Sequence, residues 1–401
     1  MDSHIASHTA ATPLDSYHLY IHVPFCRLVC AYCDFVTVGG RAADVPRYVA
    51  ALHAELALRP AVGTLSTVYF GGGTPSLLPA NAVAGLLDAA AARWGWRPAE
   101  ATLEANPSAR EIPDWASLRA AGVNRISLGA QSLRDSDLRT LARGHTADEV
   151  RQAFAAARRA GFDNVSLDLI YGIPGQTLAG WRQGLRAALA LEPDHLSLYA
   201  LQLAMEPDEW AAPPRPGALA WRRRRAAEQD DGLAADHYAL AEELLDVAGY
   251  AHYELSSWTL PGRESRHNSA YWARRPYVGL GAGAHSFDGK ARRAWNVRDL
   301  DRYLAAVEAG VLPEAGSELL DEPTAAFEAI ALGLRRVEGL SRAAFAAEFG
   351  ADPAARFASG VEAHVAAGLL EGVDDDRLRL TARGRLLASE VLTAFLPAAV
   401  A

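Results

Sequence analysis

Short strand-like segments and longer helical stretches alternate regularly from residue 17 to about residue 203 of this 401-residue chain. β-Branched and aromatic residues dominate the short segments, whereas the Ala/Leu/Arg-rich stretches between them show helical spacing. The six expected strands are His18 to Val23, Thr67 to Phe70, Thr102 to Glu104, Arg125 to Leu128, Val165 to Ile170 and His195 to Ala200. Such alternation requires parallel strands covered by helices, in either an open doubly wound sheet or a barrel.

Residues of unusual chemistry gather where these strands end. A cysteine-rich loop follows the first strand, and the other strand ends carry Gly71 to Pro75, Glu104, Gln131 and Asp168. Functional residues at the carboxyl ends of successive parallel strands are typical of a TIM-like barrel. We therefore predict an α/β fold built on a partial (β/α)6 TIM-like barrel.

The remainder of the chain suggests further parts. Prolines and arginines over 211–225 indicate an exposed insertion, and residues 322–395 show several helices followed by a short hairpin, as in a winged helix. We expect a disordered N-terminal tail (1–16), a core domain (17–232), a connecting region (233–310) and a mainly helical, winged-helix-like C-terminal domain (311–401).

Composition limits the location and partners of the protein. A net charge of −9 argues against nucleic-acid binding, and the arginine run at 222–225 is best explained as a solvated helix face. No segment approaches the roughly 20 apolar residues of a membrane span, and the N-terminus lacks the pattern of an export signal. Three clustered thiols fit a reducing compartment, so we expect a cytoplasmic protein.

All three cysteines of the chain, Cys26, Cys30 and Cys33, lie within eight residues at C-x3-C-x2-C spacing. Three thiolates in a loop after a barrel strand indicate a metal centre with one position left open. A zinc ion completed by His22 or Asp34 is the alternative. In an iron-sulfur cubane, an amino acid such as S-adenosylmethionine (SAM) could chelate the open iron through its amine and carboxylate.

Other residues at the same rim offer what SAM requires. Gly71 to Pro75 lacks the Gly-Lys-Ser/Thr ending of a phosphate loop and instead suits close approach of the backbone to a ligand. Each of Glu104, Gln131, Arg143 and Asp168 alone would usually be explained as a surface salt bridge or a cap. Together at one rim they offer a carboxylate for the ammonium of SAM, a cation for its carboxylate and polar partners for its ribose.

A further group lies in the connecting region. His267 is followed by Asn268, Tyr271 and Trp272, so that an imidazole stands beside an amide and two large aromatic rings. A buried core histidine is the usual explanation. The aromatic rings could also wall a flat hydrophobic cofactor whose iron takes the imidazole as an axial ligand.

With these motifs assembled, the sequence resembles the oxygen-independent coproporphyrinogen III oxidase-like family of radical SAM proteins, from about residue 17 to residue 395. The motifs that carry the resemblance are Tyr20 to Phe35, Tyr69 to Ser76, Glu104 to Pro107, Ile126 to Gln131, Arg143 and Leu167 to Pro174. The resemblance implies a radical SAM core domain over 17–232 and a HemN-type C-terminal domain over 311–401. It also implies a 4Fe-4S cluster and SAM as cofactors.

Roles follow from the resemblance position by position. The three cysteines are expected to bind the cluster, with Tyr20 packed near it. Gly72, Gly73 and Thr74 are expected to lie against the methionine part of SAM, and Glu104 to bind its amino group. Gln131, Arg143 and Asp168 are expected to hold the rest of SAM.

Two departures from the oxidases favour the HemW-type heme-chaperone branch of this family. The oxidases carry the cysteine spacing C-x3-C-x2-C-x-C, whereas this chain has Phe35 at the position of the last cysteine. The second departure is His267 to Trp272, which matches the H-N-x-x-Y-W motif of the chaperones. The branch implies that heme is bound, with His267 as the candidate axial ligand, and delivered to respiratory haem proteins. Transient membrane association and a homodimer stay open.

Two alternatives remain at this point. The first is an oxygen-independent coproporphyrinogen III oxidase acting in porphyrin biosynthesis. The second is DNA binding by the winged-helix-like domain, which the acidic balance and the lack of a basic recognition helix in 340–365 disfavour.

Overall fold

The computed structural model describes residues 16–61, 63–203, 217–372 and 376–397. Apart from Ser16, the expected N-terminal tail lies outside the described residues. Ser16 itself is buried and begins the first strand. The Pro-rich part of the expected insertion, residues 211–216, also lies outside the described residues.

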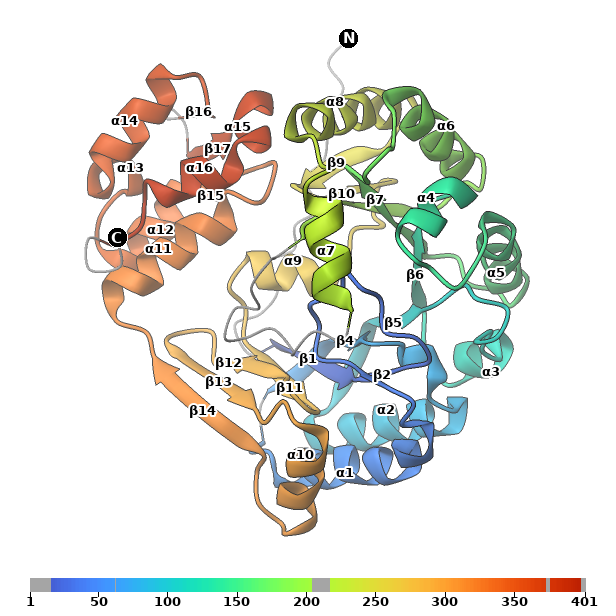
Figure 1. The fold of residues 1–401 in the computed structure, drawn as a ribbon. Helices are drawn as coiled ribbons and strands as arrows, with labels where there is room; N and C mark the ends of the chain where they lie inside the picture. Colours follow the sequence, from blue (N-terminus) through green and yellow to red (C-terminus); the bar gives the residue numbers. More distant parts are fainter. Residues whose placement is uncertain (1–15, 62, 204–216, 373–375, 398–401) are drawn as a thin grey trace.

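A curved sheet of parallel strands with helices outside forms the centre of the molecule (Figure 1). Each of the six predicted strands is present in the expected order: β1 (Ser16–Val23), β4 (Thr64–Gly72), β5 (Trp96–Ala105), β6 (Arg125–Gln131), β7 (Val165–Tyr171) and β8 (His195–Ala200). Each pairs in parallel with the next. The strand order runs from one open edge to the other without closing, which confirms the partial barrel.

Shorter strands extend both edges of this sheet. Beyond β1 follow β11 (Tyr277–Leu280), β12 (His285–Phe287), β13 (Arg292–Asn296) and β14 (Glu314–Leu319), and beyond β8 follow β10 (Ser257–Thr259) and β9 (Ala251–Glu254). β11 pairs in parallel with β1, and β12 to β14 continue as antiparallel neighbours. The connecting region therefore covers the otherwise unpaired edge of β1. Although β14 falls in the range assigned to the C-terminal domain, it belongs to this sheet.

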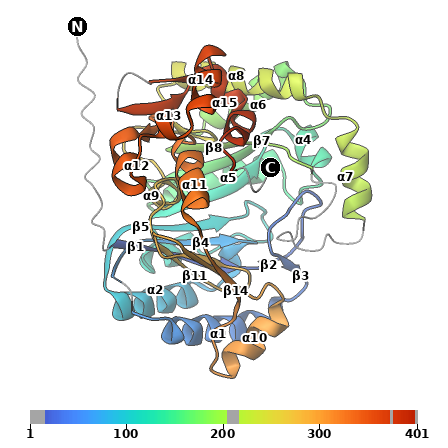
Figure 2. The same cartoon turned by 90° about the vertical axis from the view of Figure 1, so that its left-hand side faces the viewer.

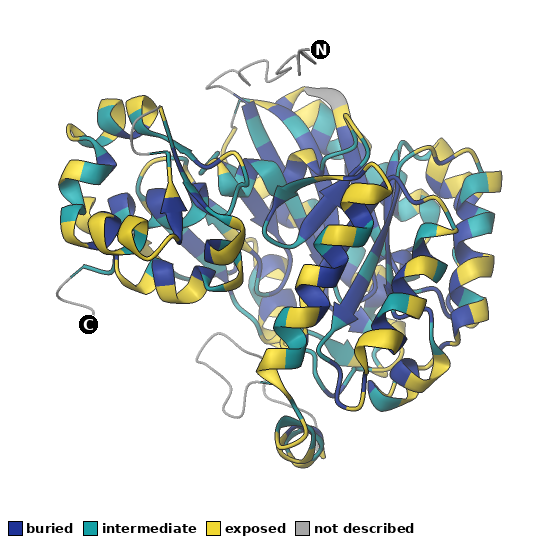
Figure 3. Cartoon of the chain, turned by 90° about the horizontal axis from the view of Figure 1, so that it is seen from above, coloured by how far each residue is buried: buried dark blue, intermediate teal, exposed yellow. Residues whose placement is uncertain are grey.

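Helices cover the convex face of the sheet. They include α1 (Val45–Leu58), α2 (Ala80–Trp94), α3 (Trp115–Ala120), α4 (Asp135–Thr140), α5 (Ala147–Arg159), α6 (Leu178–Leu189) and α8 (Asp231–Val247). In α5, Thr146 and Glu149 form a reciprocal capping box, and the buried residues Val150, Ala153 and Phe154 recur at helical spacing. Figure 3 shows buried strands enclosed by helices whose outer faces are exposed.

A second hydrophobic cluster forms the C-terminal domain. Its helices are α11 (Glu322–Gly333), α12 (Arg342–Phe349), α13 (Pro353–Arg356), α14 (Ala358–Ala366), α15 (Ala382–Leu386) and α16 (Ala388–Thr393). They accompany a small antiparallel sheet of β15 (Leu340–Ser341), β17 (Arg377–Leu380) and β16 (Leu370–Glu371). Ile330, Phe345, Leu378 and Phe395 pack together at its centre. The domain is mainly helical, as predicted (Figure 2).

Shorter elements complete the described chain. β2 (Phe25–Cys26) pairs with β3 (Val38–Gly39) in the cysteine loop, and α7 (Ala218–Ala226), α9 (Arg266–Trp272) and α10 (Leu300–Glu308) lie between larger elements. Among the described residues, no helix has the length and apolar character needed to cross a bilayer.

Candidate functional site

A cavity of ≈490 Å³, here called the cluster cavity, opens at the carboxyl ends of the central parallel strands. Ten of the predicted site residues line it: Cys26, Cys30, Cys33, Gly72, Gly73, Thr74, Glu104, Gln131, Arg143 and Asp168. These residues come from segments far apart in the sequence. Parallel strands bring them together because their carboxyl ends meet at one rim.

The cysteine loop is fixed at its base and faces the cavity with its thiols. β2 and β3 close the loop, and the backbone N–H of Cys33 donates to the carbonyl of Cys30 (3.2 Å). Burial raises the pKa of Cys26 to about 12 and that of Cys33 to about 11. The Cys26 and Cys33 thiols therefore keep their protons until a metal replaces those protons on sulfur, and cluster binding releases them.

Charged and polar side chains surround these sulfur atoms. The Arg143 guanidinium donates to the Cys30 sulfur (3.0 Å), and the Thr74 hydroxyl donates to the Cys26 sulfur (3.7 Å). Both contacts stabilise negative charge on sulfur. The donor set, three thiols facing a cavity beside a cation, fits an iron-sulfur cluster with one iron open to a small ligand.

The zinc alternative finds no support in the two residues that were to complete it. His22 engages both ring nitrogens, one with the Tyr20 hydroxyl (3.1 Å) and the other with the Val36 carbonyl (2.7 Å). Asp34 pairs with Arg222 (2.7 Å). In the described parts of the chain, no group of three or more His, Cys, Asp or Glu side chains lies so that it could hold one metal ion.

Glycines allow the end of β4 to lie directly against the cysteine loop. Gly72 has φ of 114°, in the region that favours glycine. A Cβ on Gly73 would lie 2.7 Å from the Phe25 carbonyl oxygen and 2.9 Å from the Cys26 sulfur. Any larger residue would push the strand end away from the cysteines, so the glycines set the width of the cavity here.

Two carboxylates lie on the floor of the cluster cavity. Glu104 accepts from the Tyr69 hydroxyl (2.7 Å) and from the backbone N–H of Gly72 (3.1 Å), and Asp168 accepts from the Ser127 hydroxyl (2.9 Å). Burial raises the pKa of Glu104 to about 7 and also raises that of Asp168. A ligand that brings positive charge would relieve this cost, as the ammonium of SAM would do.

Gln131 and Arg143 occupy the side of the cavity near β6. Gln131 has φ of 63°, which is uncommon for a residue with a side chain, and a bulge interrupts the pairing of β6 with β7 beside it. Strain of this kind persists where a side chain is needed in one place. Arg143 also donates to the Gly129 carbonyl (3.2 Å), so its guanidinium bridges the cysteine loop and the end of β6.

Two arginines have roles that the sequence analysis did not predict. Arg125 is 2% exposed, lines the cluster cavity and has a buried Nε without a hydrogen-bond partner in the described structure. Its charge lowers the pKa of both Glu104 and Asp168, against the larger effect of burial. The sequence did contain a signal for this role, because Arg125 is a cation at the start of the otherwise apolar strand β6.

Arg222 corrects the explanation of the arginine run as a solvated helix face. Its side chain is buried and donates to the carbonyls of Ala31 (2.9 Å) and Cys33 (3.0 Å) while it pairs with Asp34. Arg223 and Arg224 of the same helix are exposed. No sequence signal distinguishes Arg222 from its neighbours in the run.

Tyr20 and His267 lie outside the lining of the cluster cavity. Tyr20 stacks on Tyr69, with ring centroids 6.2 Å apart, and lines a second cavity. His267 is fully buried, and its ring nitrogens contact the Thr67 hydroxyl (2.7 Å) and the Tyr271 hydroxyl (2.9 Å). An iron bound to His267 would have to replace one of these hydrogen bonds, and its role as an axial ligand stays a prediction.

Comparisons with known proteins agree with this arrangement. Residues 20–186 match the model of the radical SAM superfamily, and residues 320–387 match that of the HemN C-terminal domain. Coproporphyrinogen III oxidase (HemN) from Escherichia coli has the same fold, with a TM-score of 0.80, 23% identity, and coverage of 96% of this chain and 91% of the oxidase.

Proteins with similar sequences identify the family more narrowly than the fold does. The heme chaperone HemW of Mycobacterium tuberculosis (strain ATCC 25618 / H37Rv) is 40% identical, with 96% of each chain covered. Heme chaperone HemW of Bacillus subtilis (strain 168) is 32% identical, with 94% of this chain and 98% of the relative covered. From these matches and the cavity geometry, the chain belongs to the radical SAM superfamily and, within it, to the HemW heme-chaperone family.

Proposed function

We propose that this protein is a cytoplasmic heme chaperone that holds a 4Fe-4S cluster and SAM in the cluster cavity, binds heme and passes it to respiratory haem proteins. The observation that carries the proposal is the gathering of three thiols and the side chains expected to bind SAM around one cavity, with Phe35 in place of a further cysteine. When bound, the cluster could supply an electron that breaks a sulfonium C–S bond of SAM.

The residues of the chain divide this work between them. Cys26, Cys30 and Cys33 hold the cluster, while Arg143 orients the loop through Cys30. Glu104 accepts the amino group of SAM, and its position at the end of β5 places that group beside the cysteine loop. Membrane association during delivery and a homodimer stay predictions.

An oxidase is the second candidate, because the fold of the whole chain matches that of HemN. The two candidates differ in product. An oxidase would convert propionate side chains of coproporphyrinogen III to vinyl groups, whereas a chaperone would bind heme and leave coproporphyrinogen unchanged.

Anaerobic reconstitution followed by three measurements on one sample tests the proposal. We expect about four irons per chain at saturation, stable binding of hemin on titration, and no vinyl product from coproporphyrinogen III. Cys30→Ala should lower the iron content and leave the thermal midpoint of the iron-free protein nearly unchanged, because the thiol lies at the cavity wall. Vinyl products from the wild-type protein would contradict a function limited to heme transfer.

A further inference from the structure

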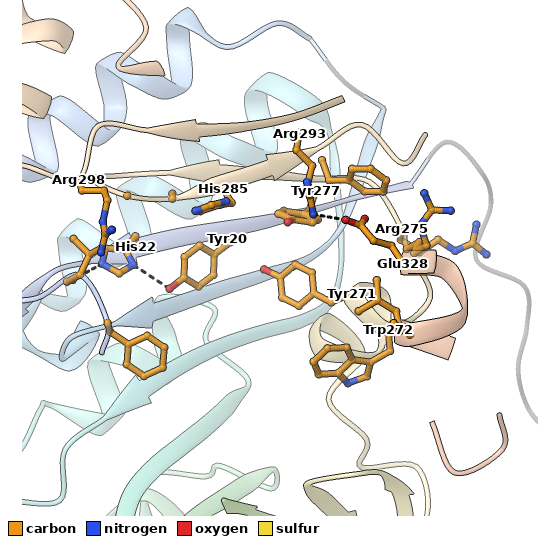
Figure 4. Close-up of a pocket in the computed structure, with 18 of the residues that line it drawn as sticks. Tyr20, His22, Tyr271, Trp272, Arg275, Tyr277, His285, Arg293, Arg298 and Glu328 are labelled. Carbon is orange, nitrogen blue, oxygen red and sulfur yellow. Dashed lines mark hydrogen bonds and ion pairs between the residues drawn. The ribbon is translucent and has the colours of Figure 1, made fainter. Parts of the chain in front are cut away.

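A second cavity of ≈590 Å³, here called the aromatic cavity, adjoins the cluster cavity. One wall is the face of β1, β11, β12 and β13, and the opposite wall is formed by α9 and α11 (Figure 4). Asp34 and Phe35 line both cavities, and Phe35 is 65% exposed. The residue that distinguishes this chain from the oxidases therefore stands at the border between the two cavities.

Rings form much of the lining. Tyr20 and Tyr277 extend from the sheet, and Tyr271 and Trp272 approach them from α9. Tyr271 and Tyr277 meet edge to face, with centroids 4.7 Å apart. The volume falls in the range of about 300–1,000 Å³ that is typical of small-molecule sites, and walls of this kind suit a planar, largely apolar ligand.

Positive charge exceeds negative charge around this cavity. Four arginines line it, Arg274, Arg275, Arg293 and Arg298, against the two carboxylates of Asp34 and Glu328. Arg222 already pairs with Asp34, Arg293 pairs with Glu328 (2.6 Å), and Arg274 pairs with Glu348 (2.6 Å) outside the lining. Among the described residues, the Arg275 guanidinium takes part in no salt bridge or hydrogen bond. A ligand that carries carboxylates would complement this lining.

His285 presents its imidazole to the same cavity. The residue is exposed on the short strand β12, and in Figure 4 it lies along the row of side chains between Arg298 at one end and Arg275 at the other. Although part of the residue is exposed, partial burial of its ring, and then the charges of Arg293 and Arg298, lower its pKa, so the imidazole is neutral near pH 7 and can donate a lone pair to a metal. His22, also in the lining, has both ring nitrogens in hydrogen bonds.

We propose that the aromatic cavity is the heme site of this protein, with His285 as an axial ligand of the iron and Arg275 pairing with a propionate. The inference rests on the proposed function and specifies where the heme is held. In this arrangement His285 is the axial ligand, and His267 positions Tyr271 in the wall of the aromatic cavity through their hydrogen bond. Binding forms a bond from the imidazole nitrogen to iron and requires no oxidation or reduction.

Hemin titration of the full-length protein tests the axial ligand. His285→Ala should weaken binding by about tenfold or more and shift the Soret band of bound hemin. His285→Met restores an iron ligand of another kind and should give a third, distinct spectrum. His53→Ala, on the outer helix α1, is the matched control and should keep the wild-type affinity and spectrum.

The propionate contact has an independent test that avoids the iron. Arg275→Gln should weaken hemin binding about tenfold but should leave the affinity for hemin dimethyl ester unchanged, because the ester has no carboxylate to lose. Arg263→Gln, remote from the lining, serves as the control for loss of a surface charge. Equal losses for hemin and its ester would contradict the contact.

The outcomes separate this inference from the proposed function. If wild-type protein fails to bind hemin, both are overturned. If the wild type binds hemin and His285→Ala keeps its affinity and Soret band, the chaperone function stands and the assignment to His285 is overturned. Loss of the spectrum in His267→Ala alone, with the same thermal midpoint as the wild type, would return the axial role to His267.

Discussion

Three charged side chains share the floor of the cluster cavity: Glu104, Asp168 and Arg125. The pKa of both carboxyls is raised by burial, and Arg125 offsets only part of that effect. Ionisation of these two carboxyls therefore has a free-energy cost, and a cationic ligand would lower that cost. In the proposed function, single residues would therefore set the affinity and the pH dependence of SAM binding, and the strand ends bring these residues together.

Glu104 leads to a prediction about pH. Because its folded-state pKa of about 7 lies above the ordinary value of 4.5, folding favours the protonated carboxyl, and the free energy of unfolding of the ligand-free protein should fall as pH rises between these values. SAM binding should strengthen over the upper part of that range, as the carboxylate forms.

Calorimetric titration with SAM at several pH values checks both the residue and the sign. Glu104→Gln should weaken SAM binding by about tenfold above pH 7 and remove this pH dependence. Glu243→Gln, on the exposed face of α8, should behave as wild type. A pH profile shared by Glu104→Gln and the wild type would rule out Glu104 as its source.

Among the elements, α7 has a role that its composition hides. It begins with Ala218 and carries four consecutive arginines, of which Arg222 turns inward to the cysteine loop. In other helices of the barrel, such as α5, buried apolar residues recur at helical spacing, so the packed face can be read from the sequence. A helix of arginines has no such spacing, so its packed face becomes visible only in the folded molecule.

Replacing Arg222 should loosen the cluster without unfolding the barrel. Arg222→Met removes the hydrogen bonds to the Ala31 and Cys33 carbonyls and the ion pair with Asp34. Groups that orient metal ligands typically change metal affinity by about 10–100-fold, and we expect iron release to a chelator to accelerate by about tenfold. The matched control is Arg223→Met on the exposed side of α7. Equal release rates for the two variants would show that α7 does not stabilise the loop.

At the scale of the whole molecule, a buried polar network joins the barrel to its extension. The Glu55 carboxylate on α1 accepts from Arg59 (2.6 Å), Asn296 (2.8 Å), Tyr303 (2.8 Å) and the backbone N–H of Gly281 (2.8 Å). Arg59 directly follows α1, Asn296 lies on β13, Tyr303 lies on α10, and Gly281 lies between β11 and β12. The network thus holds the strands that form one wall of the aromatic cavity.

Breaking this network should destabilise the protein strongly. Glu55→Ala leaves the buried Arg59 with hydrogen bonds to Gly279 and Asn296 but without its anionic partner, and loss of one member of a buried ion pair costs about 3–5 kcal/mol. Tyr303→Phe removes a single hydrogen bond at the same site and should cost only about 1 kcal/mol. Urea midpoints of the two variants provide the measurement. A smaller shift for Glu55→Ala than for Tyr303→Phe would contradict the central position of Glu55.

The sequence by itself determined the six parallel strands, their order and most of the cluster cavity. It could do so because strand and helix periodicities are local and because parallel strands align their carboxyl ends at one rim. From that geometry, the cysteine loop after the first strand and Glu104, Gln131 and Asp168 at the other strand ends were expected to lie together.

Only the tertiary structure decided which side chains turn inward in segments that have no apolar periodicity. It placed Arg222 on the cysteine loop, Arg125 beneath the two carboxylates and His267 in the core with both ring nitrogens engaged. It also joined β11 to β1 across more than 200 residues and so created the aromatic cavity. Long-range pairings of this kind depend on packing between distant segments, which no local pattern in the chain encodes.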